Sequence, residues 1–422
     1  MNNYKIAIIG LGYVGLPLAV AFSKHYQTTG YDINLSRINE LKQFNDSTLE
    51  TTTQELKNAK RLSFTTNIDN ITESNIYIIT VPTPVDVNNL PELSPLEKAS
   101  IAIGNILKKG DIVVYESTVF PGATEEYCAK ILEKESGLVL NQDFTLGYSP
   151  ERINPGDKVH TLQTITKVVA ASDKTTETIL EELYSKIIKA GVFMAKSIKV
   201  AEAAKAVENT QRDMNIAFMN ELAVMFNHMG IDTLDVIKTA STKWNFLPFT
   251  PGLVGGHCIG VDPYYLIHKS QESGYYPQLI TTARRINESM SQYVVDRFLK
   301  KLALSKIHIV NAKILVLGLT FKENCPDLRN TRVVEIIDEL SNCHAQVDVY
   351  DPWADPSQSK DFFNIKLQTE LKENYYDAIL LAVSHKQFIE LGETGMKNLL
   401  NNKGLIFDIK GMLPSSAVDE RL

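Results

Sequence analysis

The hydrophobic pattern along the first half of the chain consists of short apolar, β-branched runs that alternate with amphipathic stretches. Residues 5–9 form the first run, a glycine-rich turn follows at once, and residues 16–24 show a helical pattern. Residues 27–31 form a second run that ends in Asp32. Later runs of the same kind occupy residues 75–81, 111–116 and 144–148. Buried strands that alternate with helices predict an open parallel α/β sheet.

The pattern changes near residue 200 and later returns to alternation. Residues 200–228 are mostly good helix formers without glycine or proline, and a second helical stretch covers residues 279–304. Strand-like apolar runs reappear at residues 313–319, 346–350, 378–383 and 405–408. These patterns predict three domains: an α/β domain of residues 1–198, a helical middle domain of residues 199–304, and a smaller α/β domain of residues 305–422.

The first turn carries Gly10-Leu11-Gly12-Tyr13-Val14-Gly15 between a strand and a helix, and Asp32 follows 22 residues after Gly10. In such a turn the first glycine makes the bend, the second lets a pyrophosphate approach, and the third lets helix and strand pack. The acidic residue bonds the ribose diol and repels a 2′-phosphate, which predicts NAD rather than NADP. A Rossmann-like layer that binds no nucleotide is the alternative.

Polar residues follow three of the predicted strands. Thr83, Thr118 and Glu151 all come shortly after apolar runs. In open parallel sheets, ligands bind beyond the carboxyl ends of the strands, so these side chains are expected at one crevice. Position alone leaves Glu151 either a general base or a solvated loop acid.

A glycine-rich loop at residues 249–265 contains a thiol, an imidazole and a carboxylate, from Cys258, His257 and Asp262. The glycines of this loop allow the backbone to approach a ligand closely or to adopt a positive φ angle. The loop is therefore a candidate reactive site. The alternative is a tight structural turn around a buried cysteine, which usually behaves as a small hydrophobic residue.

Two further pairs of polar residues are notable for their spacing. Lys205 and Asn209 are four residues apart in the long helical pattern, so they share one helix face, either as a functional pair or as an exposed polar stripe. The turn after the run at residues 313–319 lacks a GxGxxG motif and carries Lys322 and Arg329 instead. Basic side chains in this position suggest a different phosphate ligand, and two solvated loop residues are the alternative.

The composition narrows the class of protein. The 422 residues carry a net charge of -7 without a long basic run, which disfavours nucleic acid and anionic membranes as partners. The four cysteines are widely scattered and show no zinc spacing, so we expect no metal site and a reduced, cytoplasmic compartment. Residues 6–22 lack charge, but their regular glycines and Pro17 argue against a signal peptide, and no other stretch is long enough to span a bilayer.

Seven ordered motifs resemble the UDP-glucose/GDP-mannose dehydrogenase family of nucleotide-sugar 6-dehydrogenases. They are residues 10–15, Val81-Pro82-Thr83-Pro84, Glu116-Ser117-Thr118, Pro150-Glu151-Arg152, Glu208-Asn209-Thr210, Gly255-Gly256-His257-Cys258 and Gly318-Leu319-Thr320-Phe321-Lys322. The resemblance implies an α/β fold of two Rossmann-like doubly wound domains joined by a long central helix that builds a homodimer. It also implies that two NAD molecules oxidise a sugar C6 alcohol to a carboxylate.

Within that family, the sequence is similar to the enzymes that act on UDP-N-acetylhexosamines. His257 stands next to Cys258, where UDP-glucose enzymes typically have serine. Residues 151–157 look most like UDP-GlcNAc or UDP-GalNAc dehydrogenases of capsule and O-antigen pathways, with UDP-GlcNAc favoured. Many UDP-glucose enzymes carry a second carboxylate four residues after the first, and this chain has Pro155 there, which puts any mechanism that needs a second acid in doubt.

The resemblance assigns roles to individual residues. It implies catalytic roles for Cys258, Lys205, Asn209, Glu151, Asp262 and Thr118. It implies NAD contacts for Gly10, Gly12, Tyr13, Val14, Gly15, Asp32, Arg37, Thr83 and Thr118. It implies UDP-sugar contacts for Glu151, Arg152, Lys205, Asn209, Arg284, Gly255, His257, Phe321, Lys322 and Arg329, with Lys410 as a further phosphate candidate.

These roles fit a four-electron oxidation. The thiolate of Cys258 adds to the intermediate aldehyde as a thiohemiacetal, which is oxidised to a thioester and released by water. Lys205 and Asn209 stabilise the oxyanions, while Glu151, with Thr118, activates the water. UDP-ManNAc or UDP-glucose could be the substrate instead. Two different classes of protein also stay open, a hydroxyacid-type dehydrogenase and a non-catalytic NAD or nucleotide-sugar sensor.

Overall fold

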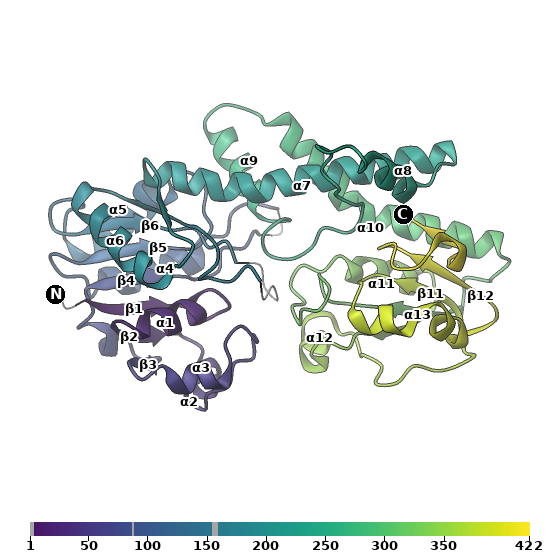
Figure 1. Cartoon of the computed structure of the whole chain (residues 1–422), viewed down its shortest axis with the longest axis horizontal. Helices are drawn as coiled ribbons and strands as arrows, with labels where there is room; N and C mark the ends of the chain where they lie inside the picture. The colour runs from purple at the N-terminus through teal and green to yellow at the C-terminus, as the bar shows by residue number, and fades with distance from the viewer. Residues whose placement is uncertain (1–3, 87, 154–158) are drawn as a thin grey trace. The chain divides into compact units, whose positions relative to one another are not determined.

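The computed structural model describes residues 4–86, 88–153 and 159–422 (Figure 1). Its contacts divide the chain into two units, each with its own sheet. Unit 1 comprises Met1–Glu208 and Tyr264–Tyr276, and unit 2 comprises Asn209–Pro263 and Pro277–Leu422. The predicted boundaries at residues 198/199 and 304/305 fall at the first residue of one long helix and the last residue of another, and the three-domain division stays a prediction.

Unit 1 contains an eight-stranded sheet in the order β3-β2-β1-β4-β5-β6-β7-β8. Its strands are β1 (Lys5–Ile9), β2 (Gln27–Tyr31), β3 (Leu62–Thr65), β4 (Ile76–Ile79), β5 (Ile112–Tyr115), β6 (Thr145–Tyr148), β7 (Lys167–Ala171) and β8 (Val192–Met194). All neighbouring strands pair in parallel except β6 and β7. The chain starts at β1, winds outward through β2 and β3, and then returns to β4 on the other side. In sheets of this kind, ligands bind beyond the carboxyl ends of the strands at such a change of direction, which here lies between β1 and β4.

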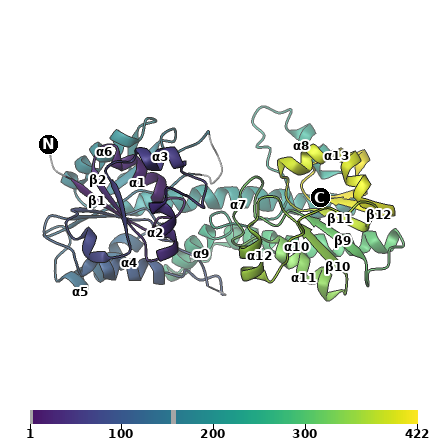
Figure 2. The same ribbon diagram turned by 90° about the horizontal axis from the view of Figure 1, so that it is seen from below.

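Helices cover both faces of this sheet, with α1 and α6 on one side and α4 and α5 on the other (Figure 2). They are α1 (Gly15–Ser23), α2 (Leu35–Lys42), α3 (Thr53–Asn58), α4 (Ser94–Gly104), α5 (Ala129–Ser136) and α6 (Lys174–Ile187). Leu16 and Leu18 of α1 and Leu180 and Leu183 of α6 are buried in one apolar cluster with strand residues. The sequence LPLAVAF forms such a helix because nearly every face of α1 is enclosed.

The middle of the chain is helical. The helix α7 (Ile198–Met229) has 32 residues, and α8 (Thr233–Ala240), α9 (Asp262–Glu272) and α10 (Gln278–Leu304) follow. Both long helical stretches predicted from the sequence are therefore present as α7 and α10. No helix among the described residues has a stretch long and apolar enough to cross a membrane.

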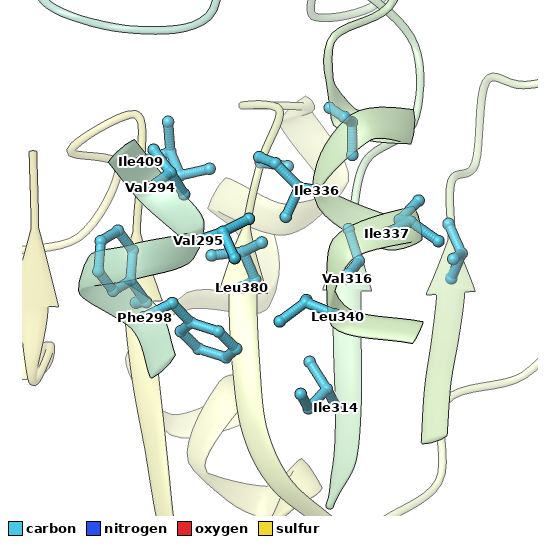
Figure 3. Packing of buried hydrophobic residues seen from close by; sticks show 14 of the residues in the cluster. Val294, Val295, Phe298, Ile314, Val316, Ile336, Ile337, Leu340, Leu380 and Ile409 are labelled. Carbon is cyan, nitrogen blue, oxygen red and sulfur yellow. The ribbon is translucent and has the colours of Figure 1, made fainter. Parts of the chain in front are cut away.

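Unit 2 contains a five-stranded parallel sheet in the order β10-β9-β11-β12-β13. Its strands are β9 (Lys313–Leu317), β10 (Gln346–Tyr350), β11 (Tyr376–Leu381), β12 (Leu400–Asp408) and β13 (Glu420–Arg421), and its other helices are α11 (Val333–Asn342), α12 (Pro356–Phe363) and α13 (Lys386–Leu399). One face of the sheet packs against α10 and α11 (Figure 3). The residues in this packing include Val294, Val295, Phe298, Ile336, Ile337, Leu340, Ile314, Val316 and Leu380. The predicted α/β class and the long central helix are confirmed, and the sheets are parallel except for the pairing of β6 with β7.

Candidate active site

The glycine-rich turn between β1 and α1 has the shape that a dinucleotide requires. Gly10 has φ +93°, and a Cβ on Gly15 would lie 1.9 Å from the carbonyl oxygen of Gly10. A Cβ on Gly12 would meet no atom within 4 Å, so this glycine faces open space. The first and third glycines are thus required by the backbone, while Gly12 leaves room for the pyrophosphate at the start of α1.

Asp32 is held at the end of β2 by the turn itself. Its Oδ2 accepts a hydrogen bond from the amide of Leu11 at 2.8 Å, and its Oδ1 accepts one from the amide of Asn34 at 2.8 Å. Each carboxylate oxygen retains a second lone pair for a ribose hydroxyl. NAD fits these residues, and when bound it supplies a hydride acceptor.

Arg37 is hydrogen-bonded to the backbone of this turn. Its Nε donates to the carbonyl oxygen of Leu11 at 2.8 Å, and its guanidinium forms ion pairs with Glu40 and with Asp46, the latter at 2.9 Å. The side chain is only 10% exposed. In this conformation Arg37 fixes the turn, and its predicted contact with NAD stays a prediction.

The other residues predicted to contact NAD lie near the carboxyl ends of the strands. Tyr13 and Val14 are half-buried at the start of α1. Thr83 follows β4 and is buried, and Thr118 follows β5 and is half-buried. The parallel pairing of β1 with β4 and of β4 with β5 brings these strand ends to one edge, as the sequence predicted.

Asp32 makes a direct prediction about the choice of cofactor. A carboxylate that bonds the ribose diol repels a 2′-phosphate, so the wild-type enzyme should strongly prefer NAD. Asp32→Ala should raise the KM for NAD, because the hydrogen bonds to the ribose are lost. It should also lower the ratio of kcat/KM for NAD to kcat/KM for NADP, because the repulsion of the 2′-phosphate is lost. The measurement is kcat/KM for NAD and NADP in both proteins, and equal wild-type values would refute this role of Asp32.

Glu151 lies just beyond β6 in a buried ionic cluster of unit 1. Its Oε1 accepts hydrogen bonds from the amides of Arg152 and Ile153, each at 2.6 Å, and its Oε2 lies 3.0 Å from the ammonium of Lys167. The same ammonium lies 2.7 Å from Glu116 Oε2. Burial would raise the pKa of Glu151, but Lys167 and the two amides overcome this and hold it below its usual range. Glu151 is therefore a buried carboxylate paired with Lys167, which excludes the alternative of a solvated loop acid.

Arg152 points toward α7. Its Nε donates to Glu208 at 3.1 Å, its Nη2 lies 2.8 Å from the same carboxylate, and its Nη1 donates to the carbonyl oxygen of Thr166 at 3.0 Å. These contacts tie the segment after β6 to α7. Most of the remainder of the predicted motif at residues 151–157, including Pro155, lies outside the described residues.

Lys205 and Asn209 are both buried, at 7% and 5% exposure, which rules out an exposed polar stripe. The Nδ2 of Asn209 donates to Asp262 Oδ2 at 2.5 Å, and Asp262 is itself only 2% exposed. Within unit 2, Asp262 therefore orients the amide of Asn209.

The loop that carries Cys258 packs against the segment that follows β9 in unit 2. A Cβ on Gly255 would lie 2.6 Å from the carbonyl oxygen of Asn330, and a Cβ on Gly256 would lie 2.7 Å from the ring of Phe321. The side chain of Asn330 also donates to the carbonyl oxygen of Gly256 at 3.2 Å. Both glycines are thus needed for this contact, which brings Gly255 and Phe321 together, and their predicted contacts with the substrate stay a prediction.

Cys258 is half-buried in the tight turn that precedes α9. Its carbonyl oxygen accepts hydrogen bonds from the amides of Val261 and Asp262, at 3.2 and 2.9 Å. Burial, with a contribution from the positive charge of Arg329, lowers the pKa of the neighbouring His257 and so favours its neutral form. A neutral His257 fits a substrate contact better than an acid catalyst.

The turn after β9 repeats the geometry of the first turn with different chemistry. Gly318 has φ +97° and donates to Tyr350 at 2.9 Å, and the amide of Leu319 donates to Asp351 at 2.6 Å. Asp351 is also bonded to the imidazole Nε2 of His385 at 3.1 Å. Burial works against ionisation, but His385 and the turn amides hold the pKa of Asp351 well below its usual range. The carboxylate oxygens of Asp351 are bonded to backbone amides of the turn and to His385, so Asp351 is not available for a ribose hydroxyl in the way proposed for Asp32.

The basic residues of this turn differ in their surroundings. Lys322 is half-buried, and Arg329 is bonded to both carboxylate oxygens of Asp327 at 2.5 to 3.1 Å. Lys410 lies close to the glycine loop, with its ammonium 3.6 Å from the Cβ position of Gly252. All of these residues belong to unit 2.

Arg284 lies inside unit 2 with an exposure of 1%. Its Nη1 lies 2.6 Å from Asp213, which also accepts a hydrogen bond from Asn287 at 2.7 Å. Asn287 in turn accepts from Asn220, and Asn220 bonds both backbone polar groups of Gly252. In this conformation Arg284 supports the base of the glycine loop, and its predicted contact with the substrate stays a prediction.

Three family models match consecutive parts of the chain. They describe the NAD binding domain, the central domain and the UDP binding domain of the UDP-glucose/GDP-mannose dehydrogenase family, at residues 4–188, 199–289 and 315–415. The chain belongs to this family. It is an NAD-dependent nucleotide-sugar dehydrogenase, and the predicted enzyme class and cofactor are confirmed.

Several dehydrogenases of this family resemble the chain over its whole length. A UDP-N-acetyl-D-glucosamine 6-dehydrogenase of Salmonella typhi is 52% identical over 100% of this chain and 99% of its own. One of the same name from Pseudomonas aeruginosa is 53% identical over 100% of both chains. The solved structure of a UDP-D-ManNAc dehydrogenase from Pyrococcus horikoshii has a TM-score of 0.88 at 30% identity, over 99% of this chain and 98% of its own.

Sequence reasoning missed several residues of this dehydrogenase that hold functional segments in place within each unit. Lys167, Asn330 and His385 are all buried or packed against a predicted site residue, and none belongs to one of the seven motifs. Lys167 opens the apolar run KVVAA, and a charged residue at the start of a buried strand was the available signal. The partners of Asn330 and His385 are distant in sequence, and no local pattern points to them.

Proposed function

We propose that the enzyme oxidises the C6 hydroxyl of UDP-N-acetyl-D-glucosamine to the carboxylate, which supplies an activated uronic acid for polysaccharide synthesis. The observation that carries the proposal is identity of 52–53% over the full chain to two dehydrogenases that bear this name. A 52% identical Staphylococcus aureus relative, Protein CapL, supports a role in capsule synthesis. UDP-GalNAc is the second candidate substrate, because an epimer at C4 presents the same groups at C2 and C6.

The proposed reaction uses a thiol for its second half. A base takes the C6 hydroxyl proton as the alcohol loses a hydride, which leaves an aldehyde. The Cys258 thiolate then adds to the aldehyde carbon and forms a C–S bond, while Lys205 and Asn209 stabilise the oxyanion. Loss of a second hydride gives a thioester. Glu151, with Thr118, takes a proton from the water that attacks the thioester carbon, and the C–S bond breaks with its electron pair on sulfur.

Comparison of four substrates tests this proposal directly. NADH formation is followed at its absorbance band with UDP-GlcNAc, UDP-GalNAc, UDP-ManNAc and UDP-glucose, each with saturating NAD. The highest kcat/KM is expected for UDP-GlcNAc, with two NADH formed per sugar consumed. A higher kcat/KM for UDP-ManNAc or UDP-glucose would overturn the substrate assignment, and binding without NADH formation would favour a sensor.

We propose that Lys322 anchors the UDP diphosphate from unit 2. It follows Phe321, whose ring contacts Gly256 in the loop of Cys258, and it lies in the part of the chain that matches the UDP binding domain. Lys322→Ala should lose about 1.5–3 kcal/mol of binding energy, typical of a charge-assisted hydrogen bond. The KM should rise by a similar factor for every UDP-sugar tested. The matched control is Lys403→Ala, at an exposed position of the same domain. An unchanged KM for Lys322→Ala would mean that Lys322 does not bind the diphosphate.

We also propose a homodimer through α7. Exposed apolar residues lie on one stripe of this helix, since their spacings of 7, 11, 7 and 4 residues keep them on one face. They are Val200, Val207, Phe218, Met225 and Met229. A second copy of the chain would cover this stripe. Sedimentation equilibrium tests the proposal, because a protein that remains a monomer at micromolar concentration would contradict it.

The cytoplasm is the proposed location. All four cysteines are free thiols in the structure, which fits a reducing compartment. Cell fractionation followed by activity measurement tests this location, and activity confined to a secreted fraction would refute it.

A further inference from the structure

Lys167 is a buried lysine that the proposed reaction does not use. It opens β7, and its side chain is only 3% exposed. The ammonium lies 2.7 Å from Glu116 Oε2, 3.0 Å from Glu151 Oε2 and 3.2 Å from the carbonyl oxygen of Pro150. An ammonium has three N–H donors, so these three acceptors satisfy it fully. We call this arrangement the Lys167 tripod.

Glu116 has no access to solvent and fixes the far side of the tripod. Its side chain is 0% exposed, and its second oxygen accepts a hydrogen bond from the hydroxyl of Tyr184 on α6. A buried charge without a partner is costly, so Glu116 and Glu151 together make a charged Lys167 tolerable in this position. Lys167, Glu116 and Tyr184 are thus a preformed unit at the ends of β5, β6 and β7.

The tripod determines which part of Glu151 is available for chemistry. A carboxylate has about four lone-pair positions. The amides of Arg152 and Ile153 occupy two of them on Oε1, and Lys167 occupies one on Oε2. Among the described contacts of Glu151, one position on Oε2 therefore remains. A single remaining acceptor position orients one water, which is what a general base requires.

We propose that Lys167, held by Glu116, is a positioning residue that keeps Glu151 ionised and aims its one remaining lone pair at the water it activates. This proposal rests on the proposed role of Glu151. In the step itself, the water transfers a proton to Glu151 as its oxygen forms a bond to the thioester carbon. The C–S bond then breaks, the thiolate is restored, and Glu151 later gives its proton to solvent.

The charges around Glu151 explain why Lys167 is needed. The titratable groups that face the cluster are Glu116, Tyr184 and Lys167, since Arg152 is turned toward Glu208. Burial raises the pKa of Glu116, while the pKa of Glu151 is held below its usual range chiefly because Lys167 overcomes burial. Without the ammonium, two buried carboxylates would remain together and at least one would take up a proton near neutral pH.

Lys167→Met tests this by removing the charge while keeping much of the volume. The acid limb of the kcat profile should move to higher pH, because Glu151 now ionises only at higher pH. At pH 7, kcat should fall by about 10²-fold or more, within the range for loss of general-base catalysis, while the KM for NAD changes little. A residue that only stabilises the fold would lower the melting temperature and leave the acid limb in place.

Two further variants keep the test decisive if Lys167→Met folds poorly. Glu116→Gln removes one carboxylate but leaves Lys167 to Glu151, so its acid limb should stay at or below the wild-type pH. Lys167→Arg keeps the charge but has a planar fork, so it should keep the acid limb and lose kcat. Lys174→Met, at an exposed site on α6, is the matched control, and both its acid limb and its kcat should equal those of the wild type.

The outcomes distinguish a failure of the proposal for Lys167 from a failure of the proposed role of Glu151. If Glu151→Gln abolishes turnover while Lys167→Met keeps the wild-type acid limb and kcat, the tripod proposal is overturned and the role of Glu151 stands. An acid limb raised equally in Glu116→Gln and Lys167→Met would also overturn it. If Glu151→Gln keeps wild-type turnover, the proposed base is wrong and Lys167 loses its assigned role with it.

Discussion

Replacing Cys258 with alanine should abolish steady-state formation of NADH from UDP-GlcNAc. The first oxidation needs no thiol, but an aldehyde has no hydride to release until a nucleophile has added to it. Loss of the nucleophile should lower kcat by at least about 10⁴-fold, as removal of a covalent catalyst does in other enzymes. The fold should survive, because Cys258 is one small, half-buried side chain in a turn made by backbone hydrogen bonds. The measurement is NADH formed per sugar consumed.

Two variants bracket this result. Cys258→Ser should be very slow, since a hydroxyl is a weaker nucleophile and its ester a poorer acyl donor than a thioester. Cys343→Ala removes another half-buried thiol of unit 2, at the end of α11, and should keep wild-type turnover. If Cys258→Ala still forms two NADH per sugar at a wild-type rate, the thiol is structural and the covalent mechanism is wrong.

The parts of the fold that could be predicted are those with strong local patterns. The glycine-rich turn at Gly10 and the runs that became β1, β4, β5 and β9 are almost wholly buried, so their sequences are continuously apolar. The strands that were not predicted are β3, β7, β8 and the two-residue β13. β3 and β8 are four and three residues long and only partly buried, and β7 begins with a lysine, so none carries a clean hydrophobic pattern.

The candidate site shows the same division between local and distant information. The spacing of Lys205 and Asn209 predicted a shared helix face because helix geometry is fixed over four residues. The bond between Asn209 and Asp262 joins residues 53 apart in the sequence, and the contact of Gly256 with Phe321 likewise depends on tertiary packing. Motifs therefore identified which residues to consider, but only the fold reveals which partner each one has.

The two glycine turns illustrate why a motif must be read together with its partners. Gly10 and Gly318 have nearly the same φ angle, and each is followed by a leucine whose amide bonds an aspartate at the end of the next strand. Each carboxylate oxygen of Asp32 accepts one backbone hydrogen bond and retains a lone pair, whereas one oxygen of Asp351 is bonded to two backbone amides and to His385. The same backbone thus leaves acceptor positions that a ribose hydroxyl could use in one unit and builds a closed structural anchor in the other.

Glu151→Gln should stop the enzyme after both oxidations and before hydrolysis. An amide does not take a proton from water, so loss of the base should slow thioester hydrolysis by about 10²–10⁴-fold. The two oxidations precede that step and do not depend on activation of this water. Mixing the variant with NAD and UDP-GlcNAc should therefore give a rapid burst of two NADH per Cys258, followed by a very slow steady rate.

The stalled protein distinguishes this outcome from a general loss of activity. Mass spectrometry after the burst should show the sugar acyl group on Cys258, and hydroxylamine should release it, because hydroxylamine attacks thioesters without a general base. Glu181→Gln, at an exposed site on α6, is the matched control and should show neither the burst nor the adduct. A variant that forms no NADH in the burst would mean that Glu151 acts before the thioester exists. The carboxylate held by Lys167 would then be the base for the alcohol, and the water would require a different acceptor.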